Sequence, residues 1–523
     1  SSAKEGLMEG VLVSAKADGS TITVTVVSDD KGRYAFPAAK LAPAHYNLKI
    51  RAIGYDLIGP GAADVTASAR AVADIKLGPT KDLSAQLSNA EWMESMPGTD
   101  AQKHNLWDCG VCHTLERIVR SKHDAAEFAP LINRMGTYSQ GATPAHPQVK
   151  KGNRGSLSDD ATPFGDGSTV KAAAEWMATI NLSHGDTWNY ALKTFPRPKG
   201  KATHVIITEY DLPRKDAQPH DVIVDSKGIA WYADFGSQFM GRLDPKTGKV
   251  TDYPVPLLKA DQPRGLLQAE FDKDENIWLS LMHQGGIAKF DVKTDKMTAY
   301  PLPADVQTDY THVSMVMPGS MHVDGKVWAN NQDDHSFLRL DTKTGAWEKM
   351  GVFKIPGENR RINSYGIPAD RENNLYVLEF SAADIGRIDA KTKDFKVWYT
   401  PTKNSKPRRG GFDKQGRLWF AEFGANRIGM LDPKTEAVKE WLLPTPWNGP
   451  YMTAADRTGQ VWSGAMLSDR VHRLDPKTGE IIEYLLPRET NIRRVWVQDA
   501  TNPVTFWVGN DHGASIIKLE PLE

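Results

Sequence analysis

The sequence has almost no cysteine: Cys109 and Cys112 are the only two in 523 residues. A small scaffold held together by several disulfides is therefore excluded. The chain also lacks any apolar run that approaches the roughly 20 residues of a membrane-spanning helix. Its first residues, SSAKEGLMEG, do not have the charged and apolar regions of a signal peptide.

An excess of charge of either sign is missing as well. The formal net charge is -1 and the isoelectric point is near 6.9, which gives no reason to expect binding to nucleic acid or to an anionic membrane. Hydrophobic residues make up 40% and charged residues 25% of the chain, as in soluble globular proteins. Because the chain is too long for one hydrophobic core, we expect several domains.

The two cysteines stand together in the stretch NLWDCGVCHTLERI, where His113 follows Cys112 directly. Covalent attachment of haem c needs two thiols for the vinyl groups and an adjacent imidazole for the iron. We therefore predict one covalent haem c, attached through Cys109 and Cys112 and with His113 as an iron ligand. As c-type cytochromes imply, such attachment takes place outside the bacterial cytoplasm, so we expect a periplasmic protein whose signal peptide has been removed.

The second axial ligand of this haem is expected on a helix further along the chain. The stretch AEFAPLINRMG places Met135 at a position comparable to that of a methionine in similar cytochrome domains. His123 and Met177 are the alternatives. Methionine ligation would raise the reduction potential and favour electron acceptance, whereas an open site would permit chemistry with oxygen or peroxide.

Residues 1–82 are predicted to form a small β-sandwich. The stretches GLMEGVLVSA, STITVTVVSD, GRYAFPA, HYNLKIRAIGY and ARAVADIKLG alternate like short strands and are separated by Gly, Pro and Asp-Asp turns. The run SDDKGRYAFPAAKLAPAHYNLKIRAIGYD resembles the carboxypeptidase regulatory-like family, with Ala44 where the family has glycine. The resemblance implies a transthyretin-like support or docking module.

Residues 83–190 change to helical periodicity. Apolar residues recur at helical spacing in LSNAEWMESM, CGVCHTLERIVRS, DAAEFAPLINRMG and TVKAAAEWMATINLS, and a turn-rich stretch at 137–168 interrupts them. Several helices around one Cys-x-x-Cys-His motif resemble a small cytochrome c domain, whose closing helix is similar to the last of these segments.

Residues 201–523 contain a repeat. A strand that ends in aromatic-x-x-Pro, or a close variant, recurs with its last proline at 213, 256, 303, 356, 401, 444 and 487, and turns of the RLDPKTG type lie between the copies. Four short strands per roughly 40–50 residues is the period of a propeller blade, so seven copies predict seven blades. Since the first copy precedes any complete blade, we expect 203–213 to pair with the last unit, 491–521, and close the ring.

The blade sequence FDKQGRLWFAEFGANRIGMLDPKT resembles the repeats of the streptogramin lyase (virginiamycin B lyase) family, and the resemblance extends over 203–521. In that family two histidines that open neighbouring inner strands act with glutamates and magnesium to open a lactone ring by elimination. The equivalent openings here are His220, Arg264, Ser320, Tyr365, Arg408, Tyr451 and Arg493 or Arg494. Only His220 matches, so the resemblance implies the fold without the elimination dyad.

Inner-strand openings line the central funnel of a propeller, and here they are rich in arginine and tyrosine. Guanidinium groups bind oxyanions through paired hydrogen bonds, so we expect a small anionic or oxygen-rich substrate. His220 beside Asp234 is the candidate general base, with Tyr365 or Tyr451 as proton donor. The predicted catalytic set is His220, Asp234, Tyr365, Arg408 and Tyr451. The predicted substrate-binding set, with carboxylates at the family's W-F-x-E position, is Arg264, Arg493, Glu379 and Glu422.

Three other histidines, His283, His335 and His512, each follow a Trp-bearing strand. Their loops are expected on one rim of the ring, where three imidazoles would suit copper, zinc or iron. A second metal site is therefore a hypothesis.

Together these features favour a mainly β, multidomain oxidoreductase that oxidises a small molecule in the funnel. Its single haem c would pass electrons to a periplasmic acceptor such as a soluble cytochrome. One haem accepts one electron while most such oxidations release two, and the sequence shows no second redox centre. Two alternatives stay open: an electron-transfer or docking protein that serves a separate dehydrogenase, and a lyase related to streptogramin lyase.

Overall fold

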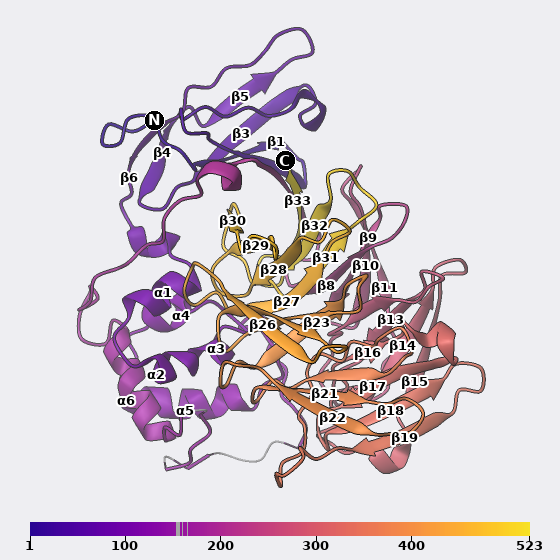
Figure 1. Ribbon diagram of the computed structural model, residues 1–523. Coiled ribbons are helices and arrows are strands. Elements are labelled where there is room, and N and C mark those ends of the chain that lie inside the picture. Colours follow the sequence, from indigo (N-terminus) through magenta and orange to yellow (C-terminus); the bar gives the residue numbers. More distant parts are fainter. Residues whose placement is uncertain (153–156, 159, 165, 523) are drawn as a thin grey trace.

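The computed structural model describes residues 1–152, 157–158, 160–164 and 166–522. The chain forms an N-terminal group of strands, a helical region and a ring of blades that contains the C-terminus (Figure 1). None of the helices in these residues has the length and apolar character needed to cross a membrane.

Six blades of the ring are built from consecutive strands that pair antiparallel (Figure 1). In the fourth blade, isolated bridges between Ser364 and Glu379 and between Ala369 and Leu375 hold the innermost segment. The strands are β8 (Pro219–Val224), β9 (Ala230–Asp234), β10 (Phe239–Asp244) and β11 (Lys249–Pro254); β12 (Ala269–Phe271), β13 (Ile277–Ser280), β14 (Gly286–Asp291) and β15 (Lys296–Pro301); β16 (Val316–Met317), β17 (Lys326–Asn331), β18 (Ser336–Asp341) and β19 (Trp347–Val352); β20 (Leu375–Leu378), β21 (Asp384–Ile388) and β22 (Phe395–Tyr399); β23 (Pro407–Phe412), β24 (Leu418–Glu422), β25 (Arg427–Asp432) and β26 (Ala437–Leu442); and β27 (Pro450–Ala455), β28 (Val461–Ala465), β29 (Arg470–Leu474) and β30 (Ile481–Leu485).

The repeated residues of each blade hold its turns. In four blades the indole N–H of a tryptophan donates to an aspartate of the preceding turn, as Trp419 does to Asp413 at 2.8 Å. In the RLDPKTG turns the aspartate accepts the backbone N–H two residues on, as Asp475 does from Lys477 at 2.9 Å. The repeat therefore specifies both the turns and the aromatic core that packs behind them.

The ring closes between strands from the two ends of the propeller sequence. β7 (Val205–Asp211) pairs antiparallel with β33 (Ser515–Pro521) along its whole length. It thereby adds the outer strand to the seventh blade, which also contains β31 (Val495–Gln498) and β32 (Thr505–Asn510). The expected closure by 203–213 is confirmed.

The N-terminal strands continue the seventh blade instead of forming an independent sheet. The other edge of β7 pairs with β2, so that one eight-stranded sheet runs from the blade into the N-terminal part. An edge strand presents unpaired N–H and C=O groups, and β2 satisfies those of β7. The N-terminal strands of this sheet are β1 (Leu12–Ala17), β2 (Ile22–Val27), β3 (Ala44–Arg51) and β5 (Ala62–Val65), and β4 (Tyr55–Gly59) and β6 (Lys76–Pro79) form a separate pair.

One expected N-terminal strand is absent. Residues 32–38 are not a strand, because the chain turns there: the backbone amides of Lys31 and Arg33 donate to Asp29 at 2.9 and 2.8 Å. The aromatic side chain of Tyr34 still packs inward, and its hydroxyl donates to the carbonyl of Ala73 at 2.6 Å.

The helical region contains short helices around a core that includes Trp92, Val119 and Ile180. Its helices in the described residues are α1 (Asn89–Ser95), α2 (Asp100–His104), α3 (Leu106–Cys109), α4 (Glu116–Val119), α5 (Ala125–Gly136) and α6 (Val170–Ile180). The helix expected over 109–121 is divided into α3 and α4, because the Cys-x-x-Cys-His segment forms a turn between them. Single 3-10 turns lie at Ala38–Lys40, Leu83–Gln86, Gly200–Thr203, Ala304–Val306 and Met321–Val323.

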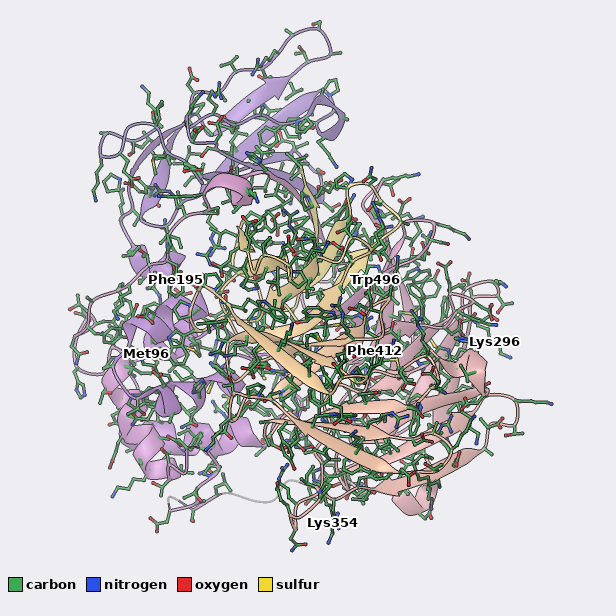
Figure 2. All side chains as sticks on the ribbon, in the orientation of Figure 1. Met96, Phe195, Lys296, Lys354, Phe412 and Trp496 are labelled. Atoms are coloured by element: carbon green, nitrogen blue, oxygen red, sulfur yellow. The ribbon has the colours of Figure 1, made fainter. Side chains whose placement is uncertain are left out.

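The helical region packs directly against the ring, and side chains fill the space between them (Figure 2). The Ala90 amide donates to the Leu467 carbonyl at 2.8 Å, and the Gln218 side chain donates to the Gly141 carbonyl at 2.9 Å. Gly141 approaches the first blade so closely that a Cβ there would lie 2.0 Å from the carbonyl oxygen of Phe235. The first and sixth blades, which lie on either side of the seventh, therefore share the helical region as a common cover.

The position of β7 between two sheets leads to a stability prediction. Ile207, in the middle of β7, is fully buried. Ile207→Ala should lower the free energy of unfolding by about 2–5 kcal/mol, because it leaves a cavity where the two sheets join. Urea denaturation followed by tryptophan fluorescence measures this change, with Ile58→Ala at an exposed position of β4 as the control. Equal stability of the two variants would contradict a joining role for β7.

Candidate functional site

A buried ionic network occupies the axis of the ring. The carboxylate of Asp221 accepts two hydrogen bonds from Arg409, at 2.6 and 2.8 Å, and one from Arg494 at 3.2 Å. These residues belong to the first, fifth and seventh blades. Burial by itself would raise the pKa of Asp221, but the Arg409 guanidinium outweighs it and holds that pKa far below the usual range. Asp221 is therefore an ionised carboxylate that ties three blades together.

His220 extends this network toward two tyrosines. Its Nδ1 lies 2.8 Å from the Asp221 carboxylate and its Nε2 lies 3.0 Å from the Tyr451 hydroxyl. Burial lowers the pKa of His220 to about 3, even though Asp221 acts in the opposite direction, so the ring is neutral. A neutral ring beside an ionised carboxylate carries its proton on Nδ1, and Nε2 accepts from Tyr451.

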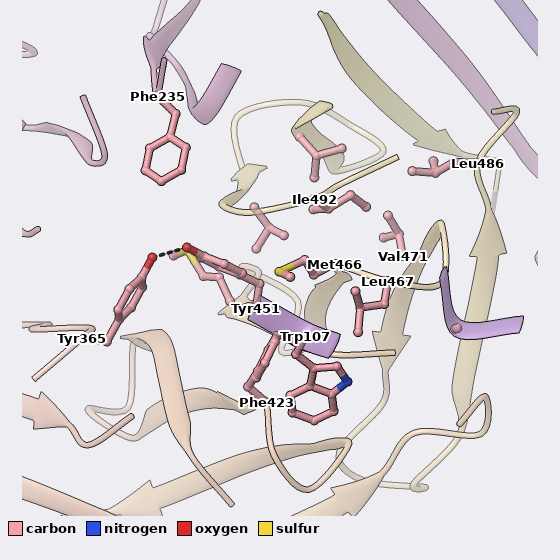
Figure 3. Close-up of a cluster of buried hydrophobic side chains, with 14 of the residues drawn as sticks. Trp107, Phe235, Tyr365, Phe423, Tyr451, Met466, Leu467, Val471, Leu486 and Ile492 are labelled. Carbon is pink, nitrogen blue, oxygen red and sulfur yellow. Dashed lines mark hydrogen bonds between the residues drawn. The ribbon is translucent and has the colours of Figure 1, made fainter. Parts of the chain in front are cut away.

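The tyrosine pair completes a hydrogen-bonded chain. The hydroxyl groups of Tyr365 and Tyr451 are bonded to each other, and Figure 3 shows the two hydroxyls pointing toward one another. Burial, with Tyr451 as a further cause, raises the pKa of Tyr365 above its usual value. In this chain His220 bonds to Asp221 and not to Asp234, so the predicted pairing of His220 with Asp234 is not confirmed. A role for His220 as a ready proton acceptor is not confirmed either. His220 instead orients Tyr451.

Bulges at the openings of the inner strands explain why neighbouring residues both reach the axis. The register of β8 shifts between Pro219 and Asp221, and that of β23 shifts between Pro407 and Gly410. In a regular strand consecutive side chains point to opposite faces, and a bulge breaks this rule. For this reason the sequence pattern did not point to Asp221 and Arg409; Pro219 and Pro407, two residues before them, mark where the register shifts.

Arg408 lies in a cage of aromatic rings. Its guanidinium carbon is 3.9 Å from the ring centre of Tyr451, 4.3 Å from that of Phe423, 4.4 Å from that of Phe380 and 4.9 Å from that of Tyr365. The side chain has no carboxylate within ion-pair distance in the described residues, and its Nε has no hydrogen-bond partner. Within the part of the chain that the structure describes, Arg408 is therefore a buried cation without a paired anion.

The Cys-x-x-Cys-His segment covers this end of the axis. Arg493 donates to the Val111 carbonyl at 2.8 Å, and Asn491 donates to the Gly110 carbonyl at 2.9 Å. Trp107, at the start of the segment, packs edge-on against Phe423 with ring centres 4.5 Å apart (Figure 3). The predicted haem motif and the predicted funnel are thus adjacent.

The residues of the motif fit a covalently attached haem. Cys109 and Cys112 are half-buried free thiols, and burial raises their pKa values to about 12 and about 11. The Nδ1 of His113 bonds to the carbonyl oxygen of Thr114 at 2.8 Å, which fixes the ring and directs Nε2 away as a free ligand atom. The motif therefore has two thiols outside any disulfide, one of which donates to the Gln140 carbonyl, and an oriented imidazole.

The candidates for the opposite axial ligand differ in exposure. Met135, in the last turn of α5, is 43% exposed, whereas Met177 is part of the apolar core. On α5 only Phe128 is buried, and its apolar neighbours Leu131 and Ile132 are partly exposed. Leu131 and Ile132 also pack in part against the main hydrophobic core. Ligation by Met135 stays a prediction, as does His123.

Four of the predicted site residues lie away from the axis. Asp234 and Glu422 end second strands of their blades, and Glu379 follows the second strand of its blade, so these carboxylates lie one strand further out. Asp234 pairs with Arg214 at 2.5 Å, and Glu379 accepts from the Asn363 amide at 2.5 Å.

Arg264 is the fourth of these residues. Its side chain is exposed, and its backbone amide donates to Gln148 of the helical region at 2.8 Å. It lies in the loop ahead of β12, outside the inner strand, which removes it from the funnel.

The three predicted metal-binding histidines do not form one group. His283 stacks on His312 with ring centres 4.6 Å apart, and His512 bonds to the Val111 carbonyl at 3.1 Å. His335 lies in a turn with φ of 61°. Within the part of the chain that the structure describes, no three His, Cys, Asp or Glu side chains are arranged to hold a metal ion. The loops carry these histidines to different blades, where each has its own contacts.

Comparison with known proteins identifies the class of the ring. Residues 269–513 match the virginiamycin B lyase family. A streptogramin B lyase structure aligns with 21% identity and a TM-score of 0.52, covering 62% of this chain and 99% of that one. Virginiamycin B lyase from Staphylococcus aureus aligns with 21% identity and a TM-score of 0.51, covering 60% and 99%.

A catalytically inactive variant of the Staphylococcus aureus enzyme with quinupristin aligns equally well, at 21% identity and a TM-score of 0.52, covering 60% of this chain and 99% of that one. The comparison with curated proteins returns no match. The ring is therefore a virginiamycin lyase-like β-propeller, and the likeness at this identity concerns its fold.

The carboxyl group of Glu422 is buried inside the fifth blade, and its protonation can be tested. Neither carboxylate oxygen has a hydrogen-bond partner among the described residues, and burial, followed by the nearby Glu440 carboxylate, raises the pKa of Glu422 to about 9. The folded protein keeps this proton while the unfolded chain releases it above about pH 4.3, so stability falls as the pH rises toward the folded pKa.

In Glu422→Gln the side chain cannot ionise, so this loss of stability with rising pH should disappear. Its free energy of unfolding should decrease less between about pH 5 and about pH 8 than that of the parent protein, by on the order of 2 kcal/mol. Urea denaturation at the two pH values measures the difference, with Glu175→Gln at an exposed position of α6 as the matched control. The same pH dependence in all three proteins would exclude a buried, protonated Glu422.

Proposed function

We propose that the chain is a periplasmic haem c-linked oxidoreductase that acts on a small anionic or oxygen-rich molecule at the propeller axis. The observation that supports this proposal is the contact between the Cys-x-x-Cys-His segment and the buried polar cluster, through Arg493 and Val111. The comparisons support only the lyase-like fold and offer no support for redox activity. The proposal therefore depends on the chemistry of the motif and on its position.

Some residues at the axis would bind the substrate, and others would hold the binding groups in place. Arg408 would attract the anionic group of the substrate, and the Tyr365 hydroxyl would donate to one of its oxygen atoms in place of its bond to Tyr451. His220, held by Asp221, would keep the Tyr451 hydroxyl in one orientation. Trp107 and Phe423 pack over this cluster and would limit the access of water, which strengthens polar interactions within it.

Cys109 and Cys112 would hold the haem covalently, and His113 and Met135 would be its axial ligands. Bound there, the haem would supply a one-electron acceptor close to the substrate. A two-electron oxidation would then need two successive transfers to an external one-electron acceptor, such as a soluble periplasmic cytochrome. The described residues offer no second metal site that would avoid this requirement.

Haem attachment is the first part of the proposal to test. The protein expressed in a periplasm with haem c maturation should retain haem in a denaturing gel, and Cys109→Ala/Cys112→Ala should lose it. Met135→Ala should retain the covalent haem but show a changed visible spectrum and a lower reduction potential, because thioether ligation raises the potential. Absence of covalent haem from the parent protein would reject the proposal.

Substrate oxidation is tested with the oxidised, haem-loaded protein. Anaerobic addition of small-molecule fractions from the host should reduce the haem with one fraction, and His220→Ala and Tyr451→Phe should slow that reduction. His45→Ala, at an exposed position of the N-terminal sheet, is the control. Reduction by another protein alone would instead favour an electron-transfer or docking role.

A lyase activity is the second candidate, because the propeller match favours it. The site opposes it in one respect: His220, the single matching histidine, is neutral, fully buried and bonded at both nitrogens. Incubation of the protein with a streptogramin B and magnesium, followed by mass spectrometry, distinguishes the two candidates. Ring opening that persists in Cys109→Ala/Cys112→Ala would identify a lyase with no need for haem.

A further inference from the structure

We propose that Arg408 is the receptor for the carboxylate group of a small monocarboxylate bound at the propeller axis. The inference rests on the proposed function in one respect, because it takes the axis to be the ligand site. It goes further by naming the residue and the chemical group that it recognises.

The first argument is the missing counter-ion. Arg409, Arg493 and Arg494 are buried beside Arg408, and each has a carboxylate partner: Arg409 pairs with Asp221 at 2.6 Å, Arg493 with Asp511 at 3.5 Å and Arg494 with Glu270 at 2.8 Å. Arg408 has none in the described part of the chain, although it is only 6% exposed. A buried charge without a partner is strongly unfavourable, so an anion from outside the protein chain would stabilise this site.

The second argument is the geometry of the cage. The four rings around Arg408 lie 3.9 to 4.9 Å from its guanidinium carbon and contribute cation–π attraction, but they carry no net charge. Such contacts leave the N–H groups at the edge of the guanidinium without acceptors, and Nε is unpaired. A carboxylate matches this edge through two parallel hydrogen bonds.

The third argument is the character of the surroundings. The Tyr365 hydroxyl is bonded to Tyr451, while Phe380 and Phe423 present apolar rings to the same cation. Arg408 and Tyr365 retain 6% and 9% of their surface, so water-sized space reaches both residues. A carboxylate with a small apolar or aromatic body fits these contacts better than a strongly hydrated inorganic anion does.

Two sources could supply this carboxylate. One is a free small molecule, and the other is a propionate of the haem that the adjacent Cys-x-x-Cys-His segment is predicted to hold. Both would place the same chemical group on Arg408, and comparison of haem-loaded protein with the haem-free Cys109→Ala/Cys112→Ala variant distinguishes them. We favour the free molecule, because the Phe423 ring packs against both Arg408 and Trp107 and so stands between this cation and the start of the segment.

The test is isothermal titration of the full chain with benzoate, with neutral benzamide as the control ligand. Benzoate should bind and benzamide should not. Arg408→Met, which retains the apolar volume but not the charge, should weaken benzoate binding by roughly tenfold or more, since a charge-assisted bond is lost. Arg408→Lys should retain part of the affinity, and Arg371→Met, at an exposed arginine, should leave it unchanged.

Each outcome decides the inference. Binding to the haem-loaded protein supports a free carboxylate. Binding to the haem-free variant alone, with a shifted haem reduction potential in Arg408→Lys, supports a propionate. Absence of binding to both forms, or equal binding to the parent and to a folded Arg408→Met or Arg408→Lys variant, overturns the inference. Benzoate binding without haem reduction by any host fraction would leave it standing while the proposed oxidoreductase function fails.

Discussion

The buried carboxylate of Asp221 is the interaction on which the centre of the molecule depends. A charge removed from water is stable only when other charges and hydrogen bonds replace its hydration, and Arg409 and Arg494 do this from two other blades. Because both arginines bind the same carboxylate, the first, fifth and seventh blades are held together at the axis. The same carboxylate holds His220, so the contact that packs the ring also orients the Tyr451 hydroxyl.

The contact between the helical region and the ring likewise both packs the protein and positions functional groups. The carbonyl groups of Gly110 and Val111 belong to a turn with no helical partners for them, and Asn491 and Arg493 of the ring donate to these groups. Backbone oxygens that a turn leaves free thus become the points of attachment to the propeller. As a consequence, the only two thiols of the chain lie close to the buried Arg493–Asp511 pair of the ring.

Much of the fold could be predicted because its signals are local. Turn aspartates, blade tryptophans and alternating strands recur within each unit, and each specifies hydrogen bonds to residues only a few positions away. The site was predicted less completely. Alternation allows only one of two adjacent residues to face the axis, so Asp221 and Arg409 were passed over for His220 and Arg408, whereas the bulges bring all four inward. Glu422 and Asp234 matched a family position that lies one strand away from the axis.

The sequence by itself determined the number of blades, the closure of the ring by its first strand, and the presence of one Cys-x-x-Cys-His motif in a helical region. These properties follow from residue order, because pairing of strands within a blade and the spacing of two thiols and an imidazole need no distant partner. Only the tertiary structure decided that β2 continues the seventh blade, that the motif covers the axis, and that Arg408 meets no carboxylate among the described residues. Each of these depends on residues far apart in the chain, such as β2 and β7 or Val111 and Arg493, whose complementarity appears only when the chain has folded.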